Sequence, residues 1–222
     1  MLDATIARAE AHDAERVIAA LEPLVYERRR ERIQEVIGQR LESVSVLFDA
    51  PHDPHNGAAV LRSCEAFGVQ YVHVVERTEH FLAAKSVAKG SQTWVDVLCH
   101  ATATEAVEAA KRSGLELVST HPDGELLPRD LASIPRLALV LGNERDGITD
   151  DLAKACARSV RVPMRGFIES LNVSVTAAIL LSAAVEGRAG DLDPATRRRM
   201  YARALYTTVD RADDVLRAVG LA

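Results

Sequence analysis

The stretch VPMRGFIESLNVSVTAA, residues 162–178, decides how the rest of the chain is interpreted. It follows a short apolar run and leads into a helical segment that is apolar almost all round. Between the two lie residue types that favour sharp backbone turns, namely Pro163, Gly166, Ser170 and Asn172. A strand, a turn and a buried helix predict a rigid socket in which backbone N–H and C=O groups face a ligand.

Outside this stretch, short β-branched runs alternate with helical segments from residue 44 to residue 187. The predicted strands are 44–48, 69–75, 93–98, 115–120, 137–141 and 159–162, and the predicted helices are 58–67, 104–113, 149–157 and the socket helix. This alternation is typical of an α/β fold with a parallel sheet that helices cover on both faces. Such sheets bind ligands beyond the carboxyl ends of their strands, where the glycine-bearing loops 142–147 and 164–166 are expected.

Both ends of the chain are predicted to be helical. We expect one helix over residues 2–21, a second and strongly charged helix over 24–41, and a C-terminal helix over 194–219. Residues 49–57 are rich in Asp, Pro and His and are predicted to form a long turn.

The composition is that of a soluble globular protein, because 48% of the 222 residues are hydrophobic and 27% are charged. Three scattered cysteines without a CxxC pair indicate neither a disulfide framework nor a zinc site, and no carboxylate–histidine spacing suggests metal ligands. The N-terminus lacks a signal-peptide pattern, and the longest apolar run is too short to span a bilayer. We therefore expect a cytoplasmic protein with no membrane partner.

A net charge of −5 argues against a protein that coats nucleic acid indiscriminately. Two local basic runs are nevertheless candidates for nucleic-acid contact: Arg28, Arg29, Arg30 and Arg32 near the N-terminus, and Arg197, Arg198 and Arg199 near the C-terminus. On charge alone, a solvated helix face is the simpler interpretation of each run.

The common nucleotide-binding motifs are absent from the sequence. Neither GxGxxG nor the GxxxxGK[ST] P-loop occurs. The loop 142–147, taken alone, is best interpreted as a tight turn. Its interpretation changes when two other loops are considered with it.

Three loops carry a known pattern. They are NGAAVLRSCEAFGV (residues 56–69), LVLGNERDGI (139–148), and VPM (162–164) followed by ESLNVS (169–174). Their types, order and spacing resemble the three motifs of the SpoU/TrmH family of RNA ribose 2′-O-methyltransferases, over residues 44–187. The segment KGSQTWV (89–95) and the helical extensions at both ends are similar to the TrmH branch of that family.

The resemblance implies the SPOUT α/β fold, a parallel sheet flanked by helices whose C-terminal part forms a deep trefoil knot. Residues 43–188 would form this methyltransferase domain, between a helical extension at 1–42 that docks RNA and a C-terminal helical extension at 189–222. The resemblance further implies S-adenosylmethionine as cofactor, a homodimer, and an RNA substrate. In the TrmH branch that substrate is tRNA, methylated on the D-loop guanosine (position 18).

The family's catalytic positions fall on Arg62, Asn56, Glu144, Ser170 and Asn172. A ribose hydroxyl is a poor nucleophile, and arginine is too basic to remove its proton. We therefore expect Arg62 to bind the adjacent phosphate and to stabilise the developing alkoxide, with the phosphate accepting the proton. Simpler roles stay open, a surface arginine for Arg62 and helix N-terminal positions for the other four residues.

The implied cofactor contacts are made largely through the backbone and fall on Thr120, Leu141, Gly142, Val162, Met164 and Leu171. Gly142 is the exception, because a side chain there would block the adenine or ribose. The implied RNA contacts fall first on the run at Arg28–Arg32 and second on the run at Arg197–Arg199.

Two other functions are kept beside tRNA methylation. One is a ribosomal RNA 2′-O-methyltransferase, including the antibiotic-resistance kind, on the same fold. The other is an RNA-binding or assembly protein that retains the fold without catalysis. The joint presence of Arg62, Glu144, Ser170 and Asn172 argues against the last alternative.

Overall fold

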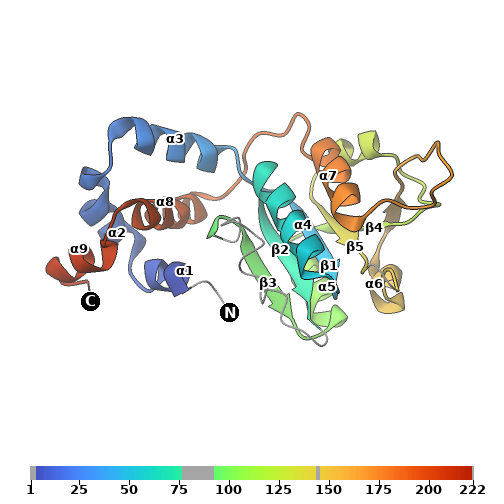
Figure 1. Cartoon of the computed structure of the whole chain (residues 1–222), viewed down its shortest axis with the longest axis horizontal. Helices are drawn as coiled ribbons and strands as arrows, with labels where there is room; N and C mark the ends of the chain where they lie inside the picture. The colour runs from blue at the N-terminus through green and yellow to red at the C-terminus, as the bar shows by residue number, and fades with distance from the viewer. Residues whose placement is uncertain (1–3, 77–92, 144–145, 222) are drawn as a thin grey trace. The chain divides into compact units, whose positions relative to one another are not determined.

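The computed structural model describes residues 4–76, 93–143 and 146–221. The chain divides into two compact units (Figure 1). We call residues 41–188 the sheet unit, and residues 1–40 together with 189–222 the helical unit.

The sheet unit is built on six parallel strands. They are β1 (Leu41–Asp49), β2 (Val69–Val75), β3 (Asp96–His100), β4 (Glu116–Thr120), β5 (Leu137–Leu141) and β6 (Arg158–Val160). Their order in the sheet is β3-β2-β1-β5-β4-β6, and every pair of neighbours is parallel. The predicted parallel α/β sheet is therefore confirmed.

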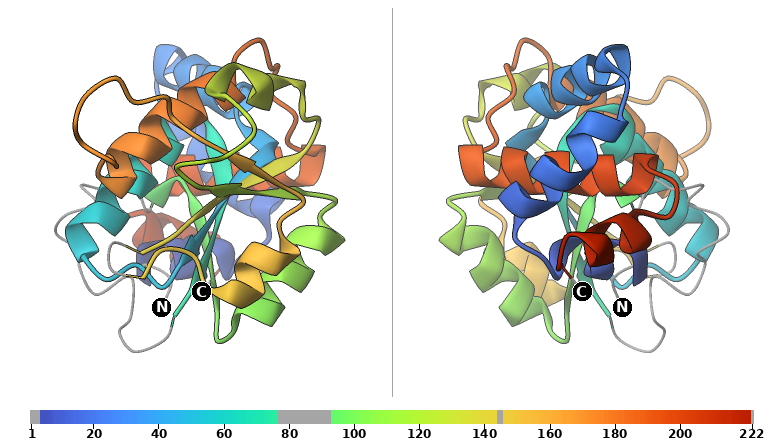
Figure 2. Two further views of the ribbon diagram at one scale, coloured as in Figure 1. Left: turned by 90° about the vertical axis from the view of Figure 1, so that its right-hand side faces the viewer. Right: turned by 90° about the vertical axis from the view of Figure 1, so that its left-hand side faces the viewer.

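Helices cover both faces of this sheet (Figure 2). On one face, α4 (Pro54–Ala66) packs against α7 (Val173–Ala184), and α7 also packs against a 3₁₀ helix at Pro128–Ser133. On the other face lie α5 (Ala103–Arg112) and α6 (Asp150–Ala155), which pack against each other. The loops that follow the strands lie at the edge of the sheet formed by the carboxyl ends of the strands, between the two helix layers.

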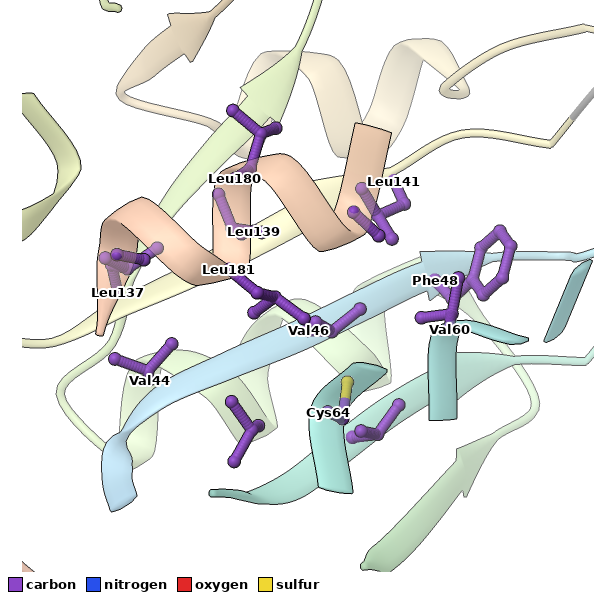
Figure 3. Close-up of a cluster of buried hydrophobic side chains, with 14 of the residues drawn as sticks. Val44, Val46, Phe48, Val60, Cys64, Leu137, Leu139, Leu141, Leu180 and Leu181 are labelled. Carbon is purple, nitrogen blue, oxygen red and sulfur yellow. The ribbon is translucent and has the colours of Figure 1, made fainter. Parts of the chain in front are cut away.

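Strand β1 shows why both faces of the sheet are buried. Successive side chains of a strand point to opposite faces. Val44, Val46 and Phe48 belong to the core cluster beneath α4 and α7, whereas Leu47 belongs to the cluster beneath α5 and α6 (Figure 3). A near-continuous apolar run of this kind is typical of a parallel strand that is covered on both faces.

The helical unit contains α1 (Ala4–Glu10), α2 (Ala14–Leu21), a 3₁₀ turn (Glu22–Leu24), α3 (Glu27–Gly38), α8 (Pro194–Thr208) and α9 (Ala212–Ala218). Helix α8 packs against α1, α2 and α3. Arg199 and the fully buried Arg203 of α8 both pair with Glu10 of α1. In the described parts of both units, no helix is long and apolar enough to cross a membrane.

Two of the three helices predicted at the ends of the chain, 2–21 and 194–219, were wrong in one respect, because each is interrupted. The third, predicted over 24–41, is uninterrupted but shorter, Glu27–Gly38. Asp13 accepts a hydrogen bond from the N–H of Arg16 at 3.1 Å, and as an N-cap it starts a second helix within residues 2–21. Near the C-terminus, α8 ends before Arg211, whose φ of 56° is left-handed and incompatible with a continuous helix.

The predicted turn over residues 49–57 was too long. A side-chain oxygen of Asp53 accepts a hydrogen bond from the N–H of His55 at 2.8 Å, and Pro54 occupies the first helical position. Helix α4 therefore begins at Pro54, and Asn56 lies in its first turn.

Candidate active site

A cavity of about 440 Å³ lies at the carboxyl ends of β4, β5 and β6, beside the N-terminus of α7. Its walls come from residues 120–122 at the end of β4, from the loop after β5, and from the long segment that leads into α7, drawn in orange in Figure 2. This is the edge at which α/β sheets bind ligands. Two of the three loops singled out in the sequence therefore meet in one cavity.

Most residues expected to contact the cofactor line this cavity. They are Thr120, Gly142, Val162, Met164 and Leu171, and the catalytic candidates Ser170 and Asn172 lie with them. The hydroxyl of Thr120 donates to the carbonyl of Val140 at 3.2 Å, which joins the end of β4 to β5. The side chain of Leu141 is fully buried in the sheet core, so it belongs to the core rather than to the cavity wall.

The loop after β5 is folded back on itself. Asn143 and Gly147 exchange two backbone hydrogen bonds of 3.0 and 3.2 Å, and Gly147 has a left-handed φ of 69°. A Cβ on Gly142 would lie 2.4 Å from the carbonyl carbon of Gly147, which is closer than real Cβ contacts come. The loop's own backbone therefore requires glycine at position 142, a reason separate from room for a ligand.

Asn172 connects the cavity to α4. Its side-chain oxygen accepts hydrogen bonds from the N–H and the hydroxyl of Ser174, at 2.8 and 2.6 Å, and so caps α7. Its side-chain nitrogen donates to Oδ1 of Asn56 at 2.9 Å. Asn172 is thus a helix cap, and it also holds Asn56, 116 positions away in the sequence, at the edge of the cavity.

Arg62 lies on the exposed surface of α4 and is not among the residues that line the cavity. It follows Asn56 by six positions, which corresponds to roughly 9 Å along the helix axis. Glu144 lies outside the described residues, as do residues 89–92 of the segment that resembles the TrmH branch. The described part of the chain therefore brings Asn56, Ser170 and Asn172 together without Arg62.

Several cavity residues were not chosen from the sequence as individual site residues, although some of them lie within the three motifs. His121 and Pro122 follow β4, Asn143 and Ile148 lie in the loop after β5, and Glu169 precedes Ser170. One feature of the sequence could have marked them as candidates, because each lies beyond the end of a predicted strand. The residue types alone gave no reason to choose them from among other loop residues.

The basic run of α8 is engaged within the helical unit. Arg198 forms an ion pair with Glu15, and Arg199 pairs with Glu10 at 2.7 Å. Arg197 donates to the carbonyl of Gly190 at 3.3 Å. These arginines join α8 to neighbouring parts of the same unit.

The basic run of α3 is more accessible. Arg28 and Arg29 are exposed, and Arg32 forms an exposed ion pair with Glu35 at 2.7 Å. Tyr26 at the start of the same helix is 89% exposed. Positive charge beside an exposed aromatic ring is a combination that suits phosphates and unpaired bases.

The chain is similar to known RNA methyltransferases. The model of the SpoU rRNA Methylase family matches residues 43–182. The tRNA (guanosine(18)-2′-O)-methyltransferase of Escherichia coli strain K12 is 33% identical over 161 residues, which cover 72% of this chain and 70% of that protein.

Solved structures agree with the sequence comparison. The TrmH/SpoU tRNA modifying enzyme of A. aeolicus has a TM-score of 0.71 at 25% identity and covers 83% of this chain and 98% of its own. The SpoU methyltransferase AviRb from Streptomyces viridochromogenes, in complex with the cofactor AdoMet, has a TM-score of 0.59 at 28% identity. That match covers 69% of this chain and 62% of AviRb.

Proposed function

The chain belongs to the SpoU rRNA methylase family, and from this we infer that it is an RNA 2′-O-methyltransferase that uses S-adenosylmethionine. We propose tRNA as the substrate and the D-loop guanosine, position 18, as the target. One observation carries the proposal. The loops after β5 and β6 line one cavity, and the first turn of α4 is joined to it by the Asn56–Asn172 hydrogen bond.

The cavity fits S-adenosylmethionine in its chemistry. Val162, Leu171 and Ile148 offer apolar surface for an adenine, and the turn at Gly142 brings backbone groups to the wall. Small-molecule sites combine apolar walls with a few polar backbone groups in this way. Thr120, Gly142, Val162, Met164 and Leu171 would hold the cofactor, with Leu141 contributing through its backbone. When bound, it supplies an electrophilic methyl group on a sulfonium sulfur.

Arg62 and the two asparagines would serve the RNA side of the reaction. The bound cofactor would supply the methyl group to the ribose 2′-oxygen, and the hydroxyl proton would pass to the adjacent phosphate. Arg62 would bind that phosphate and stabilise negative charge as it develops on the oxygen. Asn56, Asn172, Ser170 and Glu144 would orient the ribose and the arginine, because methyl transfer gains most from alignment of its two reacting atoms.

RNA docking is assigned to the helical unit, first to the run of α3. Arg28, Arg29, Arg30 and Arg32 would contact phosphates, with Tyr26 beside them for an unpaired base. Arg197, Arg198 and Arg199 are the second choice, because their side chains already contact Gly190, Glu15 and Glu10.

The remaining family features are part of the same proposal. Phe167, Ile168, Val175 and Ile179 are exposed apolar residues on α7 and the segment before it, and a second subunit would cover them in a homodimer. We propose the trefoil knot of the family for the C-terminal part of the sheet unit, with the stretch 162–178 passing through it, and a cytoplasmic location. The domain boundaries proposed are 1–42, 43–188 and 189–222.

Mass spectrometry of RNA nucleosides tests the function. Purified tRNA and ribosomal RNA are each incubated with the protein and S-adenosylmethionine that carries a labelled methyl group. A labelled 2′-O-methylguanosine in tRNA alone supports the proposal, and mapping of the modified fragment places it in the D-loop. Label in ribosomal RNA alone would assign the protein to the alternative substrate, and RNA binding without label would assign it to the non-catalytic alternative.

A further inference from the structure

The end of β1 carries a buried carboxylate that the function described so far does not use. Asp49 has no exposed surface, and it is the last residue of the strand. Its Oδ2 accepts two hydrogen bonds of 2.8 Å from Thr149, one from the backbone N–H and one from the hydroxyl. Thr149, 100 positions away in the sequence, is therefore held at two points by a single carboxylate oxygen.

Thr149 ends the loop that forms one wall of the cavity. Gly142, Asn143, Gly147 and Ile148 of this loop line the cavity, and Ile148 directly precedes Thr149. At its other end the loop leaves β5, which pairs with β1 so that Leu141 lies opposite Phe48. Strand β1 therefore holds both ends of the loop, one through the sheet and the other through Asp49.

The same strand end also directs the chain toward α4. Ala50 has a left-handed φ of 48°, an unusual conformation for a residue other than glycine, and its N–H donates to the carbonyl of Val75 at 3.0 Å. A few residues later Asp53 caps α4, which carries Asn56 and Arg62. Asp49 thus lies between two segments of the site. One is the chain that leads into α4, which carries Asn56 and Arg62, and the other is the loop after β5, which lines the cavity.

We propose that Asp49 is a positioning residue that fixes the described parts of the loop after β5, residues 142–143 and 146–149, in the shape that binds S-adenosylmethionine; this inference rests on the proposed function. A hydrogen bond to a charged acceptor is stronger than one between neutral groups, and burial strengthens it further. A loop held in one shape before binding loses less conformational entropy when the cofactor arrives. Asp49 acts through Thr149 and touches neither reacting group.

Three variants test this role in the full-length protein. Thr149→Val keeps the shape of the side chain but loses the hydroxyl donor, and Thr149→Ser keeps the donor. Asp49→Asn keeps the size of the acceptor and removes its charge. Asp150→Asn removes a neighbouring exposed charge and is the matched control.

We expect Thr149→Val and Asp49→Asn to weaken S-adenosylmethionine binding about 10-fold in calorimetry, the effect of roughly one charged hydrogen bond. Thr149→Ser should restore binding, and the KM for RNA should stay unchanged. Hydrogen exchange of the loop amides should accelerate in the two weakened variants and not in Asp150→Asn. Unchanged cofactor affinity together with unchanged loop exchange would overturn the inference, as would a fall in melting temperature with cofactor affinity preserved.

The failure of the proposed function gives a different result. A wild-type protein that binds no S-adenosylmethionine would refute the methyltransferase assignment. The exchange measurement requires no cofactor, so it still reports whether Asp49 holds the loop.

Discussion

The proposed cofactor side of the site, which is the cavity wall, and the proposed substrate side, which is α4 with Asn56 and Arg62, differ in how completely one chain builds them. On the cofactor side, loops after three neighbouring strands enclose a cavity, and Gly142 is packed so closely that a Cβ has no room. On the substrate side, Asn56 reaches the cavity through a hydrogen bond to Asn172, and Arg62 lies on the exposed surface of α4.

This difference indicates a division of labour. A cofactor of constant shape is best bound by a rigid wall that exists before it arrives. An RNA substrate is already folded and carries the phosphate to which an exposed arginine can bind. The arginine therefore gains its partner only when the RNA is bound. Substitutions on the two sides should therefore separate cofactor affinity from turnover.

The largest effect is expected from Arg62→Ala. Loss of the group that we propose stabilises the developing negative charge should lower kcat by about 10³-fold or more. S-adenosylmethionine affinity should stay nearly unchanged, because Arg62 is not a cavity residue. Single-turnover methylation and calorimetry measure the two quantities.

Arg112→Ala, at another exposed helix arginine, is the matched control and should leave both quantities as they are. A loss of cofactor binding in Arg62→Ala would contradict the division between the two sides. Arg62→Lys should recover only part of the rate, because an ammonium group cannot bind a phosphate in the bidentate manner of guanidinium.

Much of the cofactor side could be predicted from the sequence. Strand ends and turn residues are local signals that predicted a ligand socket around residues 162–178. Gly142, Met164 and Asn172 were chosen within it and beside it because they match motif positions of the family that the sequence resembles. Asp49 begins the predicted turn 49–57, but it could not be chosen, because its partner Thr149 lies 100 positions away and neither residue belongs to the three family motifs. Its role depends on strands β1 and β5 being neighbours, which is a property of topology rather than of local sequence.

The helix boundaries fail for a related reason. The interruption at Asp13 depends on one capping hydrogen bond within a segment of good helix formers. The contrast between the two Arg-Arg-Arg runs depends on whether acidic partners such as Glu10 and Glu15 come near them in the fold. Charge in a sequence does not distinguish a surface that is free to bind from one that joins helices.

The second largest effect is expected from Gly142→Ala. The added Cβ would overlap with the backbone of Gly147 and Ile148, so the loop must move. Overpacking of this kind costs about 1–3 kcal/mol, and we expect cofactor affinity to fall roughly 10- to 100-fold. RNA affinity should not change. The control is Gly38→Ala, where a Cβ meets nothing within 4 Å. A fall in RNA affinity equal to that in cofactor affinity would show that the two sides are not separate.

The hydrogen bond between the two sides gives the third prediction. Asn56→Ala removes this bond and leaves the cap of α7 intact, so kcat should fall about 10-fold with little change in melting temperature. Asn172→Ala removes both the bond to Asn56 and the cap of α7. Loss of a cap worth about 1 kcal/mol should also lower the melting temperature by roughly 2–4 °C. Thermal unfolding and initial-rate assays distinguish the two variants. Equal rates for Asn56→Ala and wild type would mean that the asparagine pair has no part in catalysis.

The smallest effect at physiological salt is expected on the exposed basic surface of α3. Replacement of Arg28 and Arg29 with Glu should weaken tRNA binding several-fold and reduce the slope of log affinity against log salt by roughly one for each phosphate that is no longer neutralised. Cofactor affinity should be unaffected, which would extend the division between the two sides to the helical unit.

Tyr26→Ala should weaken tRNA binding without changing the slope, because stacking on a base releases no counterions. Filter binding over a range of salt concentrations measures both, with Arg112→Glu as the control. An unchanged slope in the Arg28 and Arg29 variant would return this run to an ordinary solvated helix face.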